Sequence, residues 1–294
     1  MPQTYKIQKE HQVDIQPQAI VAMAVYRADK ELWLEQAIQS ILDQSYTGFV
    51  FAIVIDGPVS NDLREIVTRF AKLDKRIMVV ECVENQGLSR AMNFVIDWSL
   101  ASSPVYFFRM DADDISEPER FQTQIEFLEA HPHIDVLGSA LCEINEAGRI
   151  VGARTLPVSD KAIKRMLPKR CSLNHPTVVL RFNVFKHGFR YSEHLLNTQD
   201  YFLWSELASA GFKFTNLTSA LLKFRRVDDF YKRRGFSKSV NEFKARIYAM
   251  RLLKRTRVRY LIYAVSVLCL RLMPSFVVKF AYKIDRFFLN RGNK

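Results

Sequence analysis

The sequence predicts an α/β fold with a mixed, mainly parallel sheet flanked by helices. Short apolar segments alternate four times with amphipathic segments of helix length, which is typical of consecutive βαβ units. Turn residues such as Asp56-Gly57-Pro58 end several of the apolar segments. A cluster of aspartates follows the fourth apolar segment, at the carboxyl end of a strand where open α/β sheets bind their ligands.

The first half of the chain carries the regular alternation. Leu34, Ile38, Ile41 and Leu42 recur at the spacing that places them on one face of a helix. The expected strands span 20–26, 50–55, 77–80 and 104–108, and the expected helices span 31–42, 62–73 and 88–100.

The pattern is less regular after Arg120. We expect helices over 121–130, 160–167 and 200–210, strands over 135–144, 175–181 and 220–225, and a hairpin turn at 146–149. Gly211 is a suitable C-terminal end for the 200–210 helix.

The C-terminal quarter of the chain differs in charge from the rest. From Lys223 onward there are 20 lysines and arginines against four acidic residues, whereas the preceding residues hold 23 basic and 27 acidic side chains. Helices are expected over 239–255 and from Pro274 to about Phe288, with eleven uncharged residues at 260–270 between them. Eleven residues cannot cross a bilayer that needs about 20. Extending the segment would place Arg271 inside it, at a cost of roughly 2.5–3.5 kcal/mol.

We therefore expect these basic amphipathic helices to lie in a membrane interface, in contact with anionic head groups. Simple packing against the sheet domain is the alternative. Residues 1–18 are polar, with no apolar segment typical of a signal peptide. The four cysteines are far apart and indicate neither a zinc site nor a disulfide framework, which fits a reducing compartment.

Three carboxylates, Asp111, Asp113 and Asp114, lie within four positions after the apolar segment that ends at Phe108. They repel one another unless a cation or polar ligand compensates their charge, so a divalent metal is the first hypothesis. The following residues predict a helix start, with Ser116 as N-cap and Glu119 completing a capping box. An acidic helix N-terminus is the alternative explanation for one aspartate.

Six blocks of this sequence, in order, resemble the glycosyltransferase family 2 enzymes, which are inverting and have the GT-A (Rossmann-like nucleotide-diphospho-sugar transferase) fold. The similarity is to bacterial enzymes that build O-antigen and exopolysaccharide repeat units. The blocks are IVAMAVYRADKELWLEQAIQSILDQ (20–44), IVIDG (53–57), NQGLSRAMN (85–93), RMDADDISEPERF (109–121), NHPTVVLR (174–181) and NTQDYFLW (197–204).

The resemblance implies a catalytic domain over 19–230, preceded by the polar extension 1–18 and followed by a membrane-associating region over 231–294. It also implies a donor site for a UDP-sugar and a divalent metal, Mn²⁺ or Mg²⁺. Asp113 is the expected metal ligand, with Asp111 as a second ligand that lies nearer the nucleotide; Asp114 is left without a role. The other expected donor-binding residues are Ala24, Val25 and Tyr26 beside the base, Asp56 on the uracil imide, and Gly87, Arg90 and Ala112 near the nucleotide and its phosphates. The alternatives are a turn aspartate for Asp56 and a solvated helix residue for Arg90.

Asp200 aligns with the family's catalytic aspartate, which would take the proton from the acceptor hydroxyl. A helix N-cap is the structural alternative for Asp200. His175 is expected near the acceptor or, alternatively, as a structural histidine. Related sequences often carry Tyr-Arg-x-His near the end of the domain, where this chain reads Phe224-Arg225-Arg226-Val227 without the histidine. Only a role on the diphosphate is carried over, to Arg226.

These features predict transfer of one hexose or N-acetylhexosamine to a polyprenyl-diphosphate-linked saccharide, by a peripheral enzyme at the cytoplasmic face of the bacterial inner membrane. The QxxRW pattern of processive enzymes is absent. Two alternatives are a sugar-phosphate nucleotidyltransferase, which would want a glycine-rich loop after the first strand, and a nucleic-acid-binding protein that uses the basic tail. We expect no nucleic-acid partner, because that reading leaves the aspartates unexplained.

Overall fold

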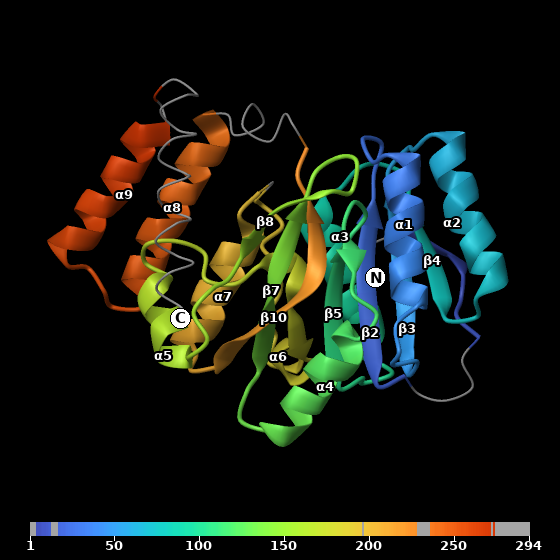
Figure 1. The fold of residues 1–294 in the computed structure, drawn as a ribbon, viewed down its shortest axis with the longest axis horizontal. Helices are drawn as coiled ribbons and strands as arrows, with labels where there is room; N and C mark the ends of the chain where they lie inside the picture. The colour runs from blue at the N-terminus through green and yellow to red at the C-terminus, as the bar shows by residue number, and fades with distance from the viewer. Residues whose placement is uncertain (1–3, 13–16, 196, 228–235, 272, 274–294) are drawn as a thin grey trace.

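The computed structural model describes residues 4–12, 17–195, 197–227, 236–271 and 273 (Figure 1). Ten strands form one sheet at its centre. They are β1 (Tyr5–Lys9), β2 (Ala19–Val25), β3 (Phe49–Asp56), β4 (Ile77–Cys82), β5 (Tyr106–Asp111), β6 (Ile115–Ser116), β7 (Val136–Ile144), β8 (Ile150–Arg154), β9 (Val179–Arg181) and β10 (Phe214–Arg225). The helices are α1 (Glu31–Leu42), α2 (Asn61–Leu73), α3 (Leu88–Ser99), α4 (Arg120–Ala130), α5 (Asp160–Met166), α6 (Asn183–Lys186), α7 (Gln199–Ser209), α8 (Phe236–Leu252) and α9 (Val258–Arg271), with a 3₁₀ turn at His175–Thr177.

The sheet is mixed, with the strand order β1-β4-β3-β2-β5-β9-β7-β10-β6 and β8 paired to β7. Strands β4, β3, β2 and β5 form a continuous parallel block, and β7 and β10 form a second parallel pair. The short strand β9 is antiparallel to both β5 and β7 and joins the two blocks. A mixed sheet flanked by helices is therefore confirmed, with the parallel character concentrated in the N-terminal block.

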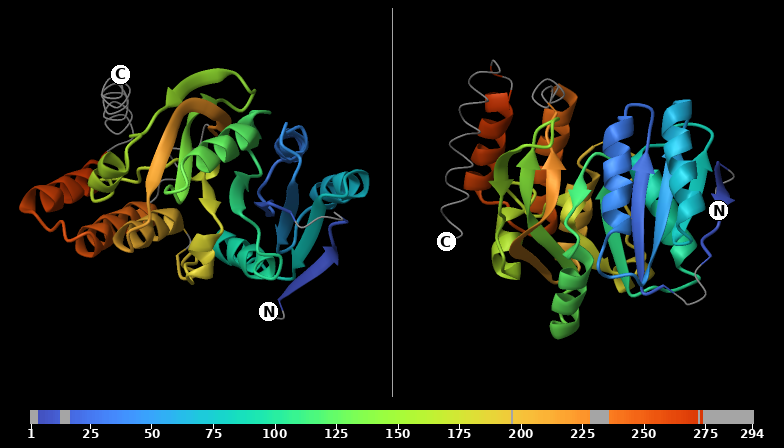
Figure 2. Two further views of the ribbon diagram at one scale, coloured as in Figure 1. Left: turned by 90° about the horizontal axis from the view of Figure 1, so that it is seen from below. Right: turned by 45° about the vertical axis from the view of Figure 1, so that its right-hand side comes forward.

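Helices cover both faces of the sheet (Figure 2). Because side chains alternate along a strand, β2 sends Ile20 and Ala22 to one core and Val21 and Met23 to the other. The first core is shared with α3, α6 and α7, and the second with α1, α2 and α4. This packing fixes the carboxyl ends of the parallel strands, where the candidate site lies.

The expected bounds agree closely for the regular elements, and the 31–42 helix has the same bounds as α1. The expected N-cap at Ser116 is wrong. Ser116 lies in β6, where it pairs with Leu222, and its hydroxyl accepts a hydrogen bond from Gln44 Nε2 at 3.1 Å. Helix α4 begins only at Arg120, and Glu119 makes no side-chain cap bond.

Two further expectations differ from the structure. The 175–181 segment is a 3₁₀ turn followed by the three-residue strand β9, because Pro176 lies in a turn in which Val178 N–H donates to His175 O. The polar N-terminal segment contains β1, which pairs antiparallel with β4 and adds an edge to the sheet. Its residues alternate between half-buried and exposed, because one face of this edge strand packs on the molecule and the other faces water.

The basic helices α8 and α9 stand at the end of the sheet opposite β1 (Figures 1 and 2). Helix α8 packs on α7, and α9 packs on α8 through Tyr260, Ala264 and Met250. Within the described ranges, no helix is both long enough and apolar enough to cross a bilayer. The helix expected between Pro274 and Phe288 lies outside the described residues.

Candidate functional site

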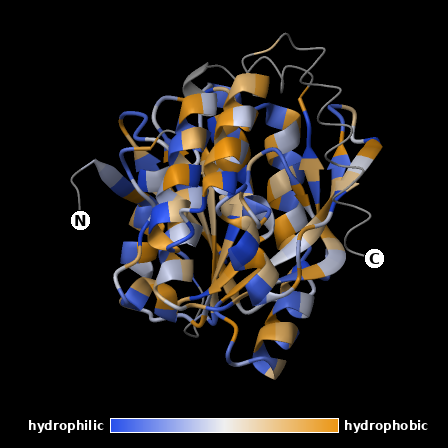
Figure 3. Ribbon diagram, turned by 90° about the vertical axis from the view of Figure 1, so that its left-hand side faces the viewer, coloured by the Kyte–Doolittle hydropathy of each residue, from blue (hydrophilic) through white to orange (hydrophobic). Residues whose placement is uncertain are grey.

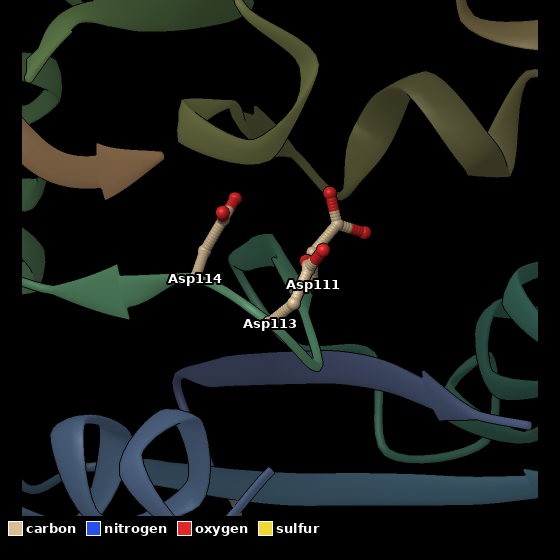
Figure 4. A group of neighbouring side chains, drawn as sticks. All are labelled: Asp111, Asp113 and Asp114. Carbon is tan, nitrogen blue, oxygen red and sulfur yellow. The ribbon is translucent and has the colours of Figure 1, made fainter. Parts of the chain in front are cut away.

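The three aspartates lie where β5 ends and turns into β6 (Figure 4). Their side chains project to the same side of this loop, and one carboxylate oxygen of each lies within 4.8 Å of the others. Ala112, between them, is buried. Strand β5 pairs in parallel with β2 so that Asp111 lies opposite Ala24. The sheet register therefore places the end of β2, expected to line the base, beside the aspartate loop.

Asp111 is paired with Arg109, the residue two positions earlier on the same strand. Arg109 is buried, with its side chain 5% exposed, whereas 27% of the Asp111 side chain is exposed. The Asp111 charge holds the pKa of Arg109 above its ordinary value in spite of burial. Asp111 is therefore a fixed carboxylate with one side open to a ligand.

Asp114 is fully buried and accepts a hydrogen bond at 2.9 Å from the Arg225 backbone N–H. Burial, with the charges of Asp113 and Asp111, raises the pKa of Asp114 well above its ordinary value. The Arg225 guanidinium donates to Asp113 O at 2.9 Å and to Gln36 Oε1 at 2.7 Å. Through these bonds Arg225, at the end of β10, holds the aspartate loop in place. Asp114, which has no role predicted from the sequence, therefore has a structural contact.

Asp113 has no ion pair within the described part of the chain. Burial and the neighbouring Asp111 charge raise its pKa to about 6, while Arg109 and Arg225 act in the opposite direction. A bound cation would relieve the repulsion between Asp113 and Asp111. Carboxylate oxygens are the donors that Mg²⁺ and Mn²⁺ prefer, so the side chains present suit either ion.

Asp56, at the end of β3, is buried and accepts three hydrogen bonds from the loop that follows β4. The donors are Asn85 Nδ2 at 3.0 Å, Gln86 N–H at 2.7 Å and Gly87 N–H at 2.8 Å. Gly87 has φ +86°, a conformation that glycine adopts without strain, and it is the N-cap of α3. This loop therefore sets the orientation of the carboxylate expected to recognise the base.

Arg90 extends from α3 to a hydrogen bond with Gln86 Oε1 and an ion pair at 3.2 Å with Glu193. These three side chains and Tyr5 of β1 are among those that line a cavity of about 440 Å³ next to the Asp56 loop. The edge strand β1 thus contributes to this part of the site, which the sequence did not indicate.

Asp200 lies in the first turn of α7 and is half-buried. The N-cap is Thr198, in a left-handed conformation (φ 63°), so the alternative reading of Asp200 as the N-cap is wrong. Asp200 Oδ2 lies 3.8 Å from Cys171 Sγ. Burial and the Asp200 charge raise the pKa of the Cys171 thiol well above its ordinary value, which keeps it protonated.

Tyr191 is buried beside α3 and His175, and its backbone N–H donates to Asn93 Oδ1 at 2.9 Å. Burial raises the pKa of the Tyr191 hydroxyl above its ordinary value. The Arg109 charge lowers this pKa, and the Asp200 and Asp111 charges raise it. His175 Nε2 lies 3.2 Å from the Tyr191 hydroxyl, and its ring meets Trp204 edge-on. Burial and the nearby Arg109 charge lower the pKa of His175 well below its ordinary value. The imidazole is therefore a neutral group that the fold holds against Tyr191 and Trp204 of α7.

Tyr26 and Arg226 lie at the edges of this arrangement. Tyr26 is 40% exposed, and its backbone N–H donates to Asp29 Oδ2 at 2.9 Å. Val25, by contrast, is buried. Arg226 Nη1 lies 3.3 Å from Glu143 Oε2, on a fully buried carboxylate. The neighbouring Arg225, which was not chosen from the sequence, makes the contacts to the aspartate loop.

Sequence reasoning thus missed Arg109, Arg225 and Tyr191. The sequence did contain a signal for Arg109, since a charged residue that continues an apolar strand needs a buried partner. Tyr191 had none, because its role comes from packing between segments far apart in the chain.

Two curated relatives align with nearly the whole chain. The amylovoran biosynthesis glycosyltransferase AmsE of Erwinia amylovora is 34% identical over 269 residues, which cover 90% of this chain and 98% of the relative. The UDP-Gal:alpha-D-GlcNAc-diphosphoundecaprenol beta-1,3-galactosyltransferase of Escherichia coli is 26% identical over 273 residues, which cover 92% and 97%.

Solved structures show the same fold at low identity. TarS 1-349 of S. aureus in complex with UDP-GlcNAc has a TM-score of 0.58 and 15% identity, with 85% of this chain and 79% of that chain covered. The mannosyltransferase PcManGT of Pyrobaculum calidifontis, in complex with GDP-Man and Mn²⁺, has a TM-score of 0.54 and 14% identity, with 94% and 84% covered.

The sequence model of the family Glycosyl transferase family 2 matches residues 20–189, which are more than half of the chain. This match and the 34% identity to a full-length relative confirm the resemblance inferred from the six sequence blocks. The chain belongs to glycosyltransferase family 2.

Proposed function

We propose that this glycosyltransferase transfers a single hexose or N-acetylhexosamine from a UDP-sugar to a polyprenyl-diphosphate-linked saccharide, with inversion, in O-antigen, capsule or exopolysaccharide biosynthesis. The name of the Escherichia coli relative supports this donor and acceptor class, since it specifies UDP-Gal and a diphosphoundecaprenol-linked sugar. The name of the Erwinia relative supports a role in polysaccharide assembly.

The donor would lie across the carboxyl ends of β2, β3 and β5. Asp56 would accept a hydrogen bond from the uracil imide, with Ala24, Val25 and Tyr26 beside the base. Gly87 allows close approach of the backbone to the nucleotide. Arg90, and Arg226 if it exchanges its bond to Glu143, would contact the phosphates.

Asp113 and Asp111 would hold Mn²⁺ or Mg²⁺, and the Mn²⁺ complex of PcManGT supports this metal class. When bound, such an ion offsets the negative charge that the departing diphosphate gathers. Asp113 is the primary ligand in this proposal, since no ion pair within the described ranges offsets its charge. Asp111, already held by Arg109, would be the second ligand and would lie nearer the ribose.

Asp200 would act as the general base, removing the acceptor proton as the acceptor oxygen bonds to the anomeric carbon and the bond to the diphosphate oxygen breaks. A single displacement of this kind inverts the anomeric centre. His175 is held against Tyr191 and would border the acceptor. Because its pKa is lowered, its imidazole is a weak base and would not compete with Asp200 for the acceptor proton. The observation that carries the proposal is the cluster of Asp111, Asp113 and Asp114 at the end of β5, with one carboxylate oxygen of each within 4.8 Å of the others.

The test is a panel of radiolabelled UDP-sugars with a polyprenyl-diphosphate-linked saccharide acceptor, in the presence and absence of EDTA. We expect one sugar to be added, activity to be lost in EDTA, and Asp200→Asn to abolish transfer with little change in UDP affinity. Activity retained in EDTA would contradict the metal role, and undiminished turnover of Asp200→Asn would remove it as the base.

The proposed place of action is the cytoplasmic face of the bacterial inner membrane, with the 19–230 catalytic domain attached peripherally through 231–294. The charge of that region supports the proposal, since 20 basic residues follow position 222. The four cysteines, all among the described residues, are free thiols.

A further inference from the structure

Helix α9 presents an apolar stripe on its outer face. Val258, Leu261, Ile262 and Val265 recur at helical spacing and are 70%, 47%, 61% and 43% exposed. Cys269 continues the stripe by one turn and is also exposed. The opposite face of α9, with Tyr260 and Ala264, is buried against α8. Figure 3 views the molecule from the α9 side and shows hydrophobic ribbon there.

Cations surround the N-terminal end of this stripe. Arg251, Lys254, Arg257 and Arg259 are exposed where α8 passes into α9. Lys169 of the catalytic domain lies on the other side of α9, with Nζ 5.9 Å from the ring centroids of both Tyr260 and Tyr263. The backbone at Lys169 is fixed to α8, since Arg246 Nε donates to Lys169 O at 2.7 Å. The basic rim, defined as the four exposed cations Arg251, Lys254, Arg257 and Arg259, therefore borders one end of the stripe, while the contacts of Lys169 attach the helices to the sheet domain.

We propose that the α9 stripe and its basic rim form one docking surface for the head-group region of an anionic phospholipid bilayer. The stripe would enter the acyl boundary, and the rim would contact the lipid phosphates. The inference rests on the proposed function for its purpose, since a lipid-linked acceptor lies in the bilayer. Its test does not depend on sugar transfer.

Two other occupants fit the chemistry less well. Residues 274–294 could cover the stripe, but they carry five basic residues against one acidic residue and would bring like charges to the rim. No acidic residue occurs between Glu242 and Asp285, so the chain offers the rim no partner there. Nucleic acid would satisfy the cations but would leave the apolar stripe in water.

The test is co-sedimentation of the full chain with phosphatidylcholine vesicles, with and without phosphatidylglycerol. We expect binding only to the anionic vesicles, a loss of about tenfold or more for Leu261→Ser/Ile262→Ser, and a loss of about fivefold per charge for Arg257→Gln/Arg259→Gln. Leu73→Ser/Val83→Ser and Lys6→Gln/Lys72→Gln are matched controls, because these residues are exposed on the α2 and β1 side of the molecule. Circular dichroism of each variant checks that the fold is retained.

A polarity-sensitive fluorophore on Cys269 gives a second measurement, with emission expected to shift to shorter wavelength when anionic vesicles are added. Equal vesicle binding by stripe, rim and control variants would overturn the proposal, as would retention on nucleic acid in preference to vesicles. A Cys269 thiol that reacts only after residues 274–294 are removed would show that the tail covers the stripe. Asp200→Asn should bind vesicles normally, so failure of the proposed chemistry and failure of docking are distinguishable.

Discussion

Gly57→Ala is expected to displace the Asp56 carboxylate, which is proposed to bind the base, although Gly57 itself is not proposed to contact the donor. Gly57 follows Asp56 with φ +88°, and a Cβ there would lie 2.5 Å from the backbone N and 2.9 Å from the Cα of Asn85. Real Cβ atoms essentially never approach other atoms so closely, and a backbone cannot rotate away as a side chain can. The loop that carries Asn85, Gln86 and Gly87 must therefore move, and it supplies the three hydrogen bonds to the Asp56 carboxylate.

Gly188→Ala separates the two contributions to this cost. Gly188 has φ +86°, but a Cβ there would meet nothing within 4 Å. Alanine in this conformation costs about 1–2 kcal/mol, offset by about 0.4–1 kcal/mol from the stiffer unfolded chain. Gly57→Ala has the same conformational cost and the same offset from the unfolded chain. It also weakens the hydrogen bonds to the buried Asp56 carboxylate, which are worth about 1.5–3 kcal/mol each when fully lost. We expect it to destabilise the fold by about 2–3 kcal/mol more than Gly188→Ala.

The assay is urea unfolding of both variants together with UDP affinity by calorimetry. Because Asp56 is the proposed partner of the uracil imide, UDP affinity should fall about tenfold or more in Gly57→Ala, equivalent to about 1.4 kcal/mol, and stay unchanged in Gly188→Ala. Equal destabilisation and equal UDP affinity in the two variants would refute the reasoning, since the close approach to Asn85 would then have no consequence.

Three further predictions concern the aspartate loop and its surroundings. Asp113→Asn should weaken Mn²⁺ binding at least about tenfold by calorimetry, because it removes one of two ligand charges; affinity equal to the wild type would exclude Asp113 as a ligand. The lowered pKa of His175 means that the unfolded chain takes up a proton near pH 6.5 that the folded chain resists, so stability is present above that pH and lost as the pH falls below it. Urea unfolding between about pH 7 and pH 5 should therefore show a smaller loss in His175→Asn than in the wild type, and equal slopes would contradict this. Arg225→Lys should cost about 2 kcal/mol in urea unfolding, because one ammonium cannot keep the bonds to Asp113 O and Gln36 together; a cost near zero would show that the guanidinium geometry is not needed.

The sequence predicted the elements whose signal is local. Helix α1 and strands β2 to β5 follow from apolar runs and helical spacing within a few residues. Strands β6 and β9 have two and three residues and exist only because distant strands pair with them, as Ser116 pairs with Leu222. No window around Ser116 contains that partner, so local helix-start chemistry gave the wrong answer there.

The contacts of Arg225 with the aspartate loop could not be predicted for a related reason. Arg225 is the last residue of β10, and neighbouring residues of an extended chain point to opposite faces, so Arg225 and Arg226 have different surroundings. Their surroundings depend on the register of β10 against β7, and that register shifts between Leu217 and Ala220 and again between Ala220 and Lys223. Counting along the sequence cannot resolve two such shifts. Position in a motif therefore indicates Arg226 for the diphosphate, whereas the contact of Arg225 with the aspartate loop is visible only in the fold.

The three aspartates illustrate what the fold adds to a motif. In the sequence they are equivalent carboxylates that repel one another, and any pair could hold a cation. In the structure Asp111 has the Arg109 guanidinium, and Asp114 is fully buried against the Arg225 N–H. Within the described ranges, Asp113 is left without an ion pair. Because Arg109 already offsets the charge of Asp111 and Asp114 is fully buried, the affinity of the site for a cation should depend chiefly on Asp113, so substitution of Asp113 should weaken metal binding more than substitution of Asp114.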